Sequence, residues 1–310
     1  MSIDGIINLI KPRGGTSFQA THLIRLWSGE QRVGHAGTLD PVAAGVLPVC
    51  LGQGTKIAQF ISDETKVYCA TIELGVVTDT YDTTGKITEK NDISAITLTQ
   101  IEDVLQTFRG HLTQKPPMYS AIKHHGRRLY SLAREGIEVE RPMRKIHIYS
   151  LELLDWHAPA ISIKVECSKG TYIRTLAYDI GRALECGAHL SDLIRLKCGP
   201  FHIDDGVTLP EIADAFRHNY WHNYIYPLDT HLSDWQAAIV NQKTREMIEN
   251  GKSIALETAI NNGNIPFFSE NDLVNYCRVY TTGGQFIAIM HREYDGKLWH
   301  PEKVFSRNKN

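Results

Sequence analysis

The strongest constraint on the fold is the run from Lys66 to Gly75, in which two kinds of side chain alternate along the chain. Successive side chains of a β-strand point to opposite faces, so a period of two predicts a strand with one face against the core. The run from Ile161 to Cys167 alternates in the same way, and the apolar run from Ile3 to Ile10 is also expected to be a buried strand. One face of the first strand holds Tyr68, Ala70, Ile72 and Leu74, and the other holds Val67, Cys69, Thr71 and Glu73.

Helical periodicity separates these strands. The spacing of Thr16 and Gln19 predicts a capping box at the start of a helix that runs to about Trp27. Apolar residues at helical spacing predict a second helix over Thr97–Phe108. A third helix begins after the turn Ser168–Arg174 and carries an apolar stripe of Ile173, Leu176, Ile180 and Leu184.

The length and composition describe an ordinary globular protein. With 310 residues, 42% of them hydrophobic and 22% charged, the chain can bury a core for one large domain and a small one. After Pro210 the chain becomes richer in Asn, His and acidic residues, and from Trp235 it is interpreted as a helix followed by short strands. We therefore expect a large domain over 1–230 and a small, mostly β domain over 235–310.

Several classes of protein are not indicated by the sequence. The first residues resemble no secretory leader, and no apolar run approaches the roughly 18 residues of a membrane span, so we expect a cytoplasmic protein that does not enter membranes. The six cysteines include no C-x-x-C pair, so we expect reduced, mostly buried thiols, with neither a zinc site nor a disulfide framework. We also expect no metal and no cofactor.

The charge is distributed unevenly along the chain. The net charge is −2, but residues 109–200 hold 15 Lys and Arg against 9 Asp and Glu, a net +6 that leaves −8 for the rest. Within this region residues 114–128 mix basic and aromatic side chains around Pro116 and Pro117, which suits either a nucleic-acid contact or a solvated loop. The acidic turn Thr78–Gly85 lacks the spacing of an EF-hand and is expected to be a solvated loop.

A loop with three glycines offers the best candidate for a site. Gly34, Gly37 and Gly45 allow the backbone to approach a ligand closely, and the loop holds one carboxylate, Asp40, followed by a proline. A turn in which Asp40 only bonds its own backbone is equally compatible with this segment. Tyr68 and Arg174 are the other candidates, because a guanidinium would keep a nucleophilic carboxylate ionised and an aromatic ring could stack on a flat substrate.

Five segments, in this order, resemble the bacterial tRNA pseudouridine synthase B (TruB) family, and the resemblance runs from end to end. The segments are Asn8–Ser17, Gly34–Gly52, Lys115–Ala121, Cys167–Leu176 and Pro301–Phe305. The resemblance implies a mixed α/β (α+β) pseudouridine-synthase fold around a largely antiparallel sheet, with an RNA-binding insertion at about 110–145 and a C-terminal PUA-like module. It implies an isomerase that converts uridine to pseudouridine at position 55 of the tRNA T loop. The expected partner is the T-arm of tRNA, with no obligatory protein partner and a monomeric state.

The resemblance also assigns roles to single residues. Asp40 matches the catalytic aspartate, which attacks the sugar or helps to form a glycal. Arg174 matches the arginine paired with it, Tyr68 the tyrosine that stacks on the uracil, and Tyr172 a second tyrosine that contacts the substrate. The remaining matches are His35, which supports the flipped-out conformation of the loop, Leu193 of a segment in which Ile194 replaces an arginine, and Lys11 and Pro12, which we expect to support the aspartate loop.

Two other classes of function remain open at this point. A glycosidase or nucleosidase would also act at C1′ but would need a second carboxylate, for which the sequence shows no convincing candidate. A non-catalytic tRNA-binding or RNA-folding protein would explain the basic segment without any role for Asp40.

Overall fold

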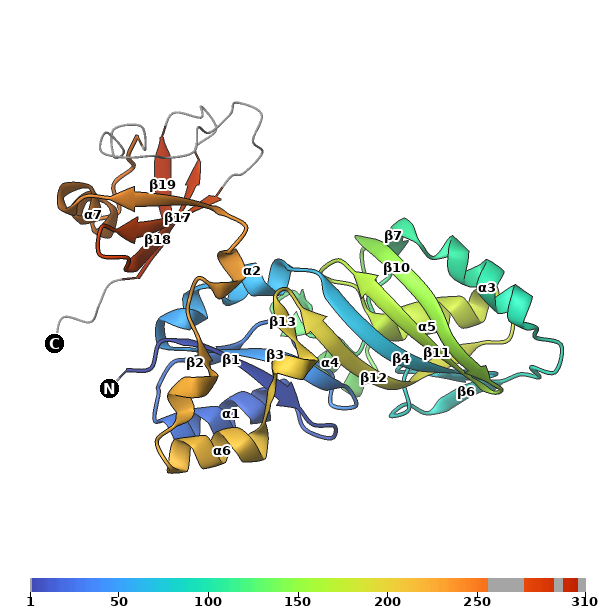
Figure 1. Cartoon of the computed structure of the whole chain (residues 1–310). Helices are drawn as coiled ribbons and strands as arrows, with labels where there is room; N and C mark the ends of the chain where they lie inside the picture. The colour runs from blue at the N-terminus through green and yellow to red at the C-terminus, as the bar shows by residue number, and fades with distance from the viewer. Residues whose placement is uncertain (1, 256–275, 293–297, 306–310) are drawn as a thin grey trace.

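The computed structural model describes residues 2–255, 276–292 and 298–305. Within these residues eleven strands form one large mixed sheet, whose main path runs β14-β1-β3-β12-β4-β11-β10-β7 (Figure 1). Three short strands join this path at its sides: β2 (Val33–His35), β13 (Phe201–His202) and β15 (Ile225–Tyr226). The path strands are β14 (Val207–Thr208), β1 (Gly5–Lys11), β3 (Ala44–Leu51), β12 (Ala188–Cys198), β4 (Lys66–Leu74), β11 (Ala160–Cys167), β10 (Arg144–His157) and β7 (Gly110–Gln114).

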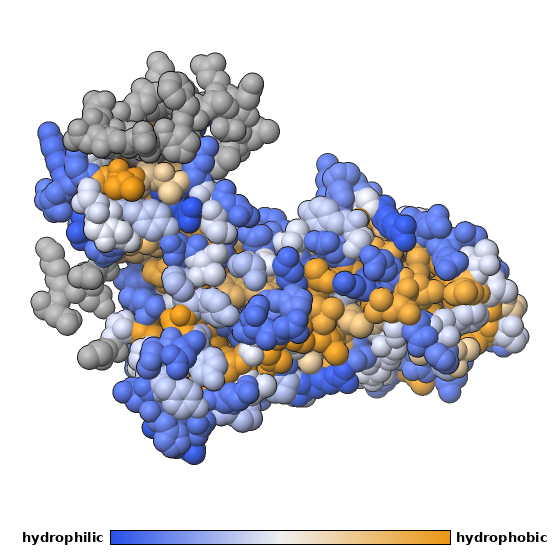
Figure 2. Space-filling model, in the orientation of Figure 1, coloured by the Kyte–Doolittle hydropathy of each residue, from blue (hydrophilic) through white to orange (hydrophobic). Residues whose placement is uncertain are grey.

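The sheet is largely antiparallel, as predicted. Along its path only the pairs β1–β14 and β3–β12 are parallel, and the others run antiparallel. The alternation that predicted β4 is confirmed, because every second residue from Lys66 to Leu74 is buried. Figure 2 shows hydrophobic residues gathered over β12, β4, β11 and β10 on the face turned to the viewer. The helices α3 (Leu98–Thr107) and α5 (Ile173–Ala183) lie behind these strands in Figure 1.

The strand at the centre of this sheet, β12, has no counterpart in our sequence predictions. It pairs with β4 over most of its length and with β3 at Ile194 and Arg195. Gly45 of β3 makes this junction possible, because a Cβ added there would lie 2.2 Å from the Arg195 carbonyl oxygen. Its φ of +102° also lies in the region that favours glycine. The last glycine of the candidate loop is therefore required by the sheet.

The helices begin where the capping signals place them. Thr16 and Gln19 form the predicted capping box of α1 (Ser17–Ser28), and α3 has the same arrangement. After β3 the chain forms η1 (Gly52–Lys56) and α2 (Ala58–Asp63). Outside the region 110–145, the larger part also contains α6 (Leu209–Arg217), η2 (Ile203–Asp205), η3 (Trp221–Tyr224), η4 (Thr230–Leu232) and the hairpin β5 (Val76–Thr78) and β6 (Ile87–Lys90).

The region 110–145 begins on the sheet edge and then leaves it. After β7 the chain forms the two-stranded ribbon β8 (Lys123–His124) and β9 (Arg127–Arg128) and the short helix α4 (Leu129–Arg134), and it returns to the sheet as β10. Leu129 and Leu132 are buried, whereas Arg127 and Arg128 are exposed. Arg141 is buried and donates to the Pro116 carbonyl, but the other Lys and Arg side chains of this region face solvent on a segment anchored at both ends.

A second, four-stranded sheet follows in the C-terminal part, in the order β16-β17-β18-β19. The strand β16 (Gln236–Val240) comes first and α7 (Gln242–Glu249) second, so the predicted helix near Trp235 was placed too early. The strands β17 (Tyr276–Thr281), β18 (Phe286–Arg292) and β19 (Trp299–Val304) complete the sheet, and the rest of the predicted domain, 256–275 included, lies outside the described residues.

This small sheet packs against the larger part through aromatic contacts. The Phe60 ring of α2 meets Trp235 at 5.4 Å and Tyr276 at 5.5 Å between ring centroids, both edge-on. Lys56 Nζ donates a hydrogen bond of 2.6 Å to the Val304 carbonyl. No helix in the described ranges is both long and apolar enough to cross a membrane.

Candidate functional site

The glycine-rich loop is held at its base by backbone contacts. Ser17 Oγ at the start of α1 donates to the Leu39 carbonyl at 3.1 Å and accepts from the Leu39 N–H at 2.9 Å. The Gly14 N–H donates to the Pro41 carbonyl at 2.8 Å. Asp40 lies between these two anchors, and its side chain remains 36% exposed, so its carboxylate is fixed in place yet open to a substrate.

Arg174 provides the other half of the site. Its side chain is only 4% exposed, and its Nε lies 2.8 Å from Asp40 Oδ2, as an ion pair without the alignment of a hydrogen bond. Nη1 donates to the Thr80 carbonyl at 3.2 Å and Nη2 to the Tyr119 carbonyl at 2.9 Å. A guanidinium fixed on three sides in this way holds the neighbouring carboxylate in one orientation.

The turn 78–85 contains a buried carboxylate, which the sequence did not predict. Asp82 has a side chain that is 6% exposed, and its Oδ2 lies 3.6 Å from Arg174 Nη1. Its Oδ1 accepts hydrogen bonds from Thr80 Oγ1 at 2.8 Å, Thr84 N at 2.9 Å and Thr84 Oγ1 at 2.5 Å. The prediction of a solvated loop is therefore wrong for Thr78, Thr80 and Asp82, because tertiary packing turns these side chains inward.

Tyr68 lies on the buried face of β4, where it is 8% exposed, opposite Arg195 of β12. Burial raises the pKa of the Tyr68 hydroxyl to about 12, against the opposing effect of the Arg195 charge. Arg195 is 1% exposed and donates from Nε to the Val46 carbonyl at 2.6 Å and from Nη2 to the Gly37 carbonyl at 3.0 Å. One arginine thus links Tyr68 to both ends of the aspartate loop.

The predicted substrate contacts come from three different elements. Tyr172 occupies the N-cap position of α5, and burial raises the pKa of its hydroxyl. Leu193 of β12 is 5% exposed and pairs with Ala70. His35 ends β2, burial lowers the pKa of its ring, and its Nδ1 has no hydrogen-bond partner among the described residues.

Lys11 and Pro12 lie beside the loop rather than in it. Lys11 is 1% exposed, and its Nζ donates to the carbonyls of Pro12 at 2.8 Å and Gly15 at 2.6 Å. Burial lowers the pKa of the Lys11 ammonium to about 8, while the Asp40 charge opposes this shift. This ammonium therefore orders the turn that leads into α1, which in turn anchors Leu39.

Sequence reasoning missed Asp82 and the supporting role of Arg195. Each had a partial signal, because Asp82 lies in a turn already noted for its carboxylates and Arg195 lies in the segment that contains Leu193. Neither signal reveals burial, which decided both roles. In the described part of the chain, no three His, Cys, Asp or Glu side chains gather as a metal site would need.

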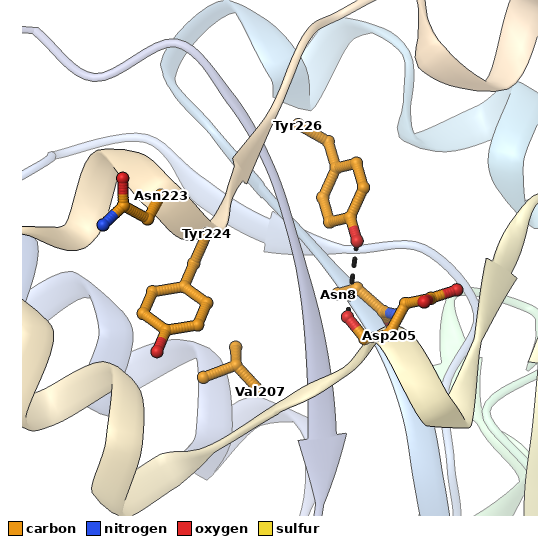
Figure 3. Close-up of a pocket in the computed structure, with 6 residues that line it drawn as sticks. All are labelled: Asn8, Asp205, Val207, Asn223, Tyr224 and Tyr226. Carbon is orange, nitrogen blue, oxygen red and sulfur yellow. Dashed lines mark hydrogen bonds between the residues drawn. The ribbon is translucent and has the colours of Figure 1, made fainter.

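A hollow of about 260 Å³ lies elsewhere, beside β1 (Figure 3). It opens where the partner of β1 changes from β15 at Ile6 and Ile7 to β14 at Leu9 and Ile10. Asn8 Nδ2 donates to the His202 carbonyl at 2.7 Å, and the Tyr226 hydroxyl donates to the Asp205 carbonyl at 3.3 Å. None of the predicted site residues lines it; its lining is Asn8, Asp205, Val207, Asn223, Tyr224 and Tyr226.

Comparison with solved structures identifies the fold. The chain matches the structure titled "Crystal Structure of a Cbf5-Nop10-Gar1 Complex" with a TM-score of 0.73 and 25% identity, over 97% of this chain and 85% of that one. It matches "Structure of H/ACA RNP bound to a substrate RNA containing 2'-deoxyuridine" with a TM-score of 0.72 and 23% identity, over 98% and 86%.

Comparison with sequences identifies the family. Residues 25–173 match the N-terminal domain of the TruB family pseudouridylate synthases, and residues 174–233 match the tRNA pseudouridylate synthase B C-terminal domain. Among curated relatives, tRNA pseudouridine synthase B of Dehalococcoides mccartyi (strain CBDB1) is 41% identical over 98% of this chain and 97% of its own length. The protein of the same name from Clostridium kluyveri is 42% identical over 96% and 98%.

The fold and the sequence matches together define a pseudouridine synthase, an enzyme of the isomerase class. The chain belongs to the TruB family of these enzymes.

Proposed function

We propose that this tRNA pseudouridine synthase isomerises the uridine at position 55 in the T loop of tRNA, with Asp40 as its catalytic carboxylate. The observation that carries the proposal is the pairing of the buried Arg174 with the partly exposed Asp40, at 2.8 Å. A carboxylate that is held in one orientation by a fixed cation and is still reachable has the two properties required of a group that acts at C1′.

The reaction is an isomerisation, which neither adds nor removes atoms. The C1′–N1 bond of the uridine breaks, the base turns within the pocket, and a C1′–C5 bond forms, while the proton leaves C5 and N1 gains one. Asp40 would assist either by attacking C1′ or by helping to form a glycal, and both routes use the same ion pair with Arg174.

Tyr68 and Tyr172 would hold the detached uracil. With a pKa of about 12, the Tyr68 phenol is neutral at neutral pH. It can therefore stack on the base, and its oxygen can help to remove the C5 proton only if the hydroxyl passes on its own proton. Leu193 would supply an apolar contact for the same base.

The target base is stacked inside a folded RNA loop and must leave the stack to reach the site. Extruding it costs roughly a few kcal/mol, which stacking and phosphate contacts would offset. We assign the support of the flipped-out loop conformation to His35 and the phosphate contacts to the exposed basic residues of 110–145. The division into a catalytic domain over 1–230 and a PUA-like domain over 235–310, the monomeric state and the cytoplasmic location belong to the same proposal.

The test compares Asp40→Asn with the natural protein on unmodified tRNA. We expect similar tRNA affinity and no pseudouridine, measured by filter binding and by base-specific chemical mapping. A matched control is Asp79→Asn, since Asp79 is exposed and its Oδ1 accepts only a loop hydrogen bond from Lys86 N. Substantial turnover by Asp40→Asn would refute the assignment of Asp40. Release of free uracil would indicate a nucleosidase, and binding without modification by the natural protein would indicate an RNA-binding module.

A further inference from the structure

Gln114 makes an unusual contact for a residue at the end of an edge strand. It is the last residue of β7, pairs with Arg144 of β10 and is 3% exposed. Its side-chain Oε1 accepts a hydrogen bond of 2.8 Å from the Tyr172 N–H, and its Nε2 donates one of 3.0 Å to the Tyr172 carbonyl. Both ends of one amide therefore bind the backbone of one residue.

The residue bound in this way begins the helix of the site. Tyr172 is the N-cap of α5 but provides no side-chain cap of its own, and Arg174 is the second residue of the helix. Polar groups at a helix start need partners from elsewhere when the local sequence supplies none. Gln114 supplies an acceptor for the Tyr172 N–H from a distant strand, and it adds a second donor to the Tyr172 carbonyl, which also accepts from the Leu176 N–H at 3.0 Å. It therefore fixes both the position and the direction of the first turn of α5.

The same segment also reaches the arginine directly. The Tyr119 carbonyl accepts the hydrogen bond from Arg174 Nη2 at 2.9 Å. Between these two contacts the chain passes through Pro116 and Pro117, which restrict its conformation. Gln114 is therefore the anchor on the rigid sheet from which the contact between Tyr119 and Arg174 is held.

We propose that Gln114 is a positioning residue for the isomerisation, acting through Tyr172 and Arg174. The proposal rests on the proposed function of the ion pair between Asp40 and Arg174. An amide that aligns the start of α5 places the guanidinium against Asp40 and the Tyr172 ring against the base. A displacement of about 1 Å at a catalytic group can lower a rate about 100-fold, so the amide affects turnover more than affinity.

Gln114→Glu is the sharpest test, because the side chain keeps its shape and, when ionised, loses the donor and gains a negative charge. At pH 8 the glutamate is ionised, accepts from the Tyr172 N–H and repels the Tyr172 carbonyl. When protonated, it again offers one donor and one acceptor. We expect kcat to fall about 10- to 100-fold at pH 8, with the tRNA Kd changed less than threefold, and the ratio of variant to natural kcat to rise as the pH falls.

Two further variants separate positioning from stability. Gln114→Ala should lose a similar factor in kcat at every pH, because neither hydrogen bond can be restored. Gln53→Glu is the matched control, since Gln53 is 5% exposed and lies in η1, outside the proposed site. It should lower the unfolding temperature while leaving kcat at a permissive temperature within twofold of the natural value.

Some results would overturn the proposal. Natural kcat in both Gln114 variants, a loss confined to Kd, or a Gln114→Glu ratio that does not depend on pH would each do so. A loss of kcat in Gln53→Glu equal to that in Gln114→Glu would assign the effect to general stability and would also refute positioning. The Asp40→Asn assay answers a different question, because turnover by that variant would remove the catalytic assignment whatever the Gln114 variants show.

Discussion

Replacing Asp82 by asparagine should weaken both the fold and the reaction. The change preserves the size of the side chain and an oxygen that can still accept from Thr80 and Thr84. It removes the negative charge that lies 3.6 Å from Arg174 Nη1, in a pair whose two side chains are 4% and 6% exposed. Arg174 would then depend on Asp40 alone for a neutralising charge.

The magnitude follows from this geometry. At an effective dielectric constant of about 20, two unit charges 3.6 Å apart attract by about 5 kcal/mol before the cost of desolvation is counted. Removing one partner of a buried pair typically costs about 3–5 kcal/mol, because the other charge stays buried. Since Asp40 still offers partial compensation, we expect a loss of about 3 kcal/mol in the free energy of unfolding. We expect at least a tenfold fall in single-turnover rate as the guanidinium shifts.

Urea unfolding and single-turnover pseudouridine formation measure the two effects separately. Asp79→Asn is the control, because this exposed carboxylate lies on the same turn, and exposed changes usually cost less than about 1 kcal/mol. If Asp82→Asn unfolds at the same urea concentration as the natural protein and turns over at the same rate, the buried pair neither stabilises the turn nor orients Arg174.

Three further predictions concern the surroundings of the site. Burial lowers the pKa of Lys11 from 10.5 to about 8. Between about pH 8 and 10.5 the unfolded chain therefore binds more protons than the folded one, and the free energy of unfolding should rise with pH in this range. Urea titrations of Lys11→Met should lack this contribution. Phe60→Ala should lower the free energy of unfolding by about 3–5 kcal/mol and speed proteolysis near residue 235, which a protease time course would show. Tyr81 has a φ of +63° and stacks on Tyr178 at 4.1 Å; Tyr81→Ala should cost at least about 1 kcal/mol in urea unfolding, whereas Tyr81→Phe should cost almost nothing.

Much of the fold was readable from local patterns. Short-range rules predicted three features: the alternation in β4 and β11, the capping box at Thr16, and the glycine loop. Each depends on which face a side chain takes or on which backbone angles a residue allows. The strand β12 was not readable in this way. Its two edges pair with β3 and β4, so the strand is held inside the sheet. Polar residues such as Arg195 are buried in it because the fold provides hydrogen-bond partners, and the hydrophobic pattern that would indicate a buried strand is interrupted.

In the candidate site, too, some residues were predicted from sequence motifs and others were found only in the structure. The motifs pointed to Asp40, Tyr68 and Arg174, and the structure brings Asp40 and Arg174 into contact. It also places two other polar residues around them: Asp82 beside the guanidinium and Gln114 at the start of α5. Nothing in their neighbouring residues predicts this burial, because a turn with several carboxylates and a segment of mixed polar residues are both typical of a surface.

The sequence by itself determined the order of the elements, the glycines where backbone must pass close to backbone, and the residues able to perform the chemistry. Only the tertiary structure decided which polar groups meet. Local preferences fix the conformation of a few neighbouring residues, whereas the burial of Asp82 or Gln114 depends on strands and helices distant in the chain that together exclude water. A carboxylate or an amide acquires a fixed partner only after that exclusion, and the proposed roles of both residues follow from it.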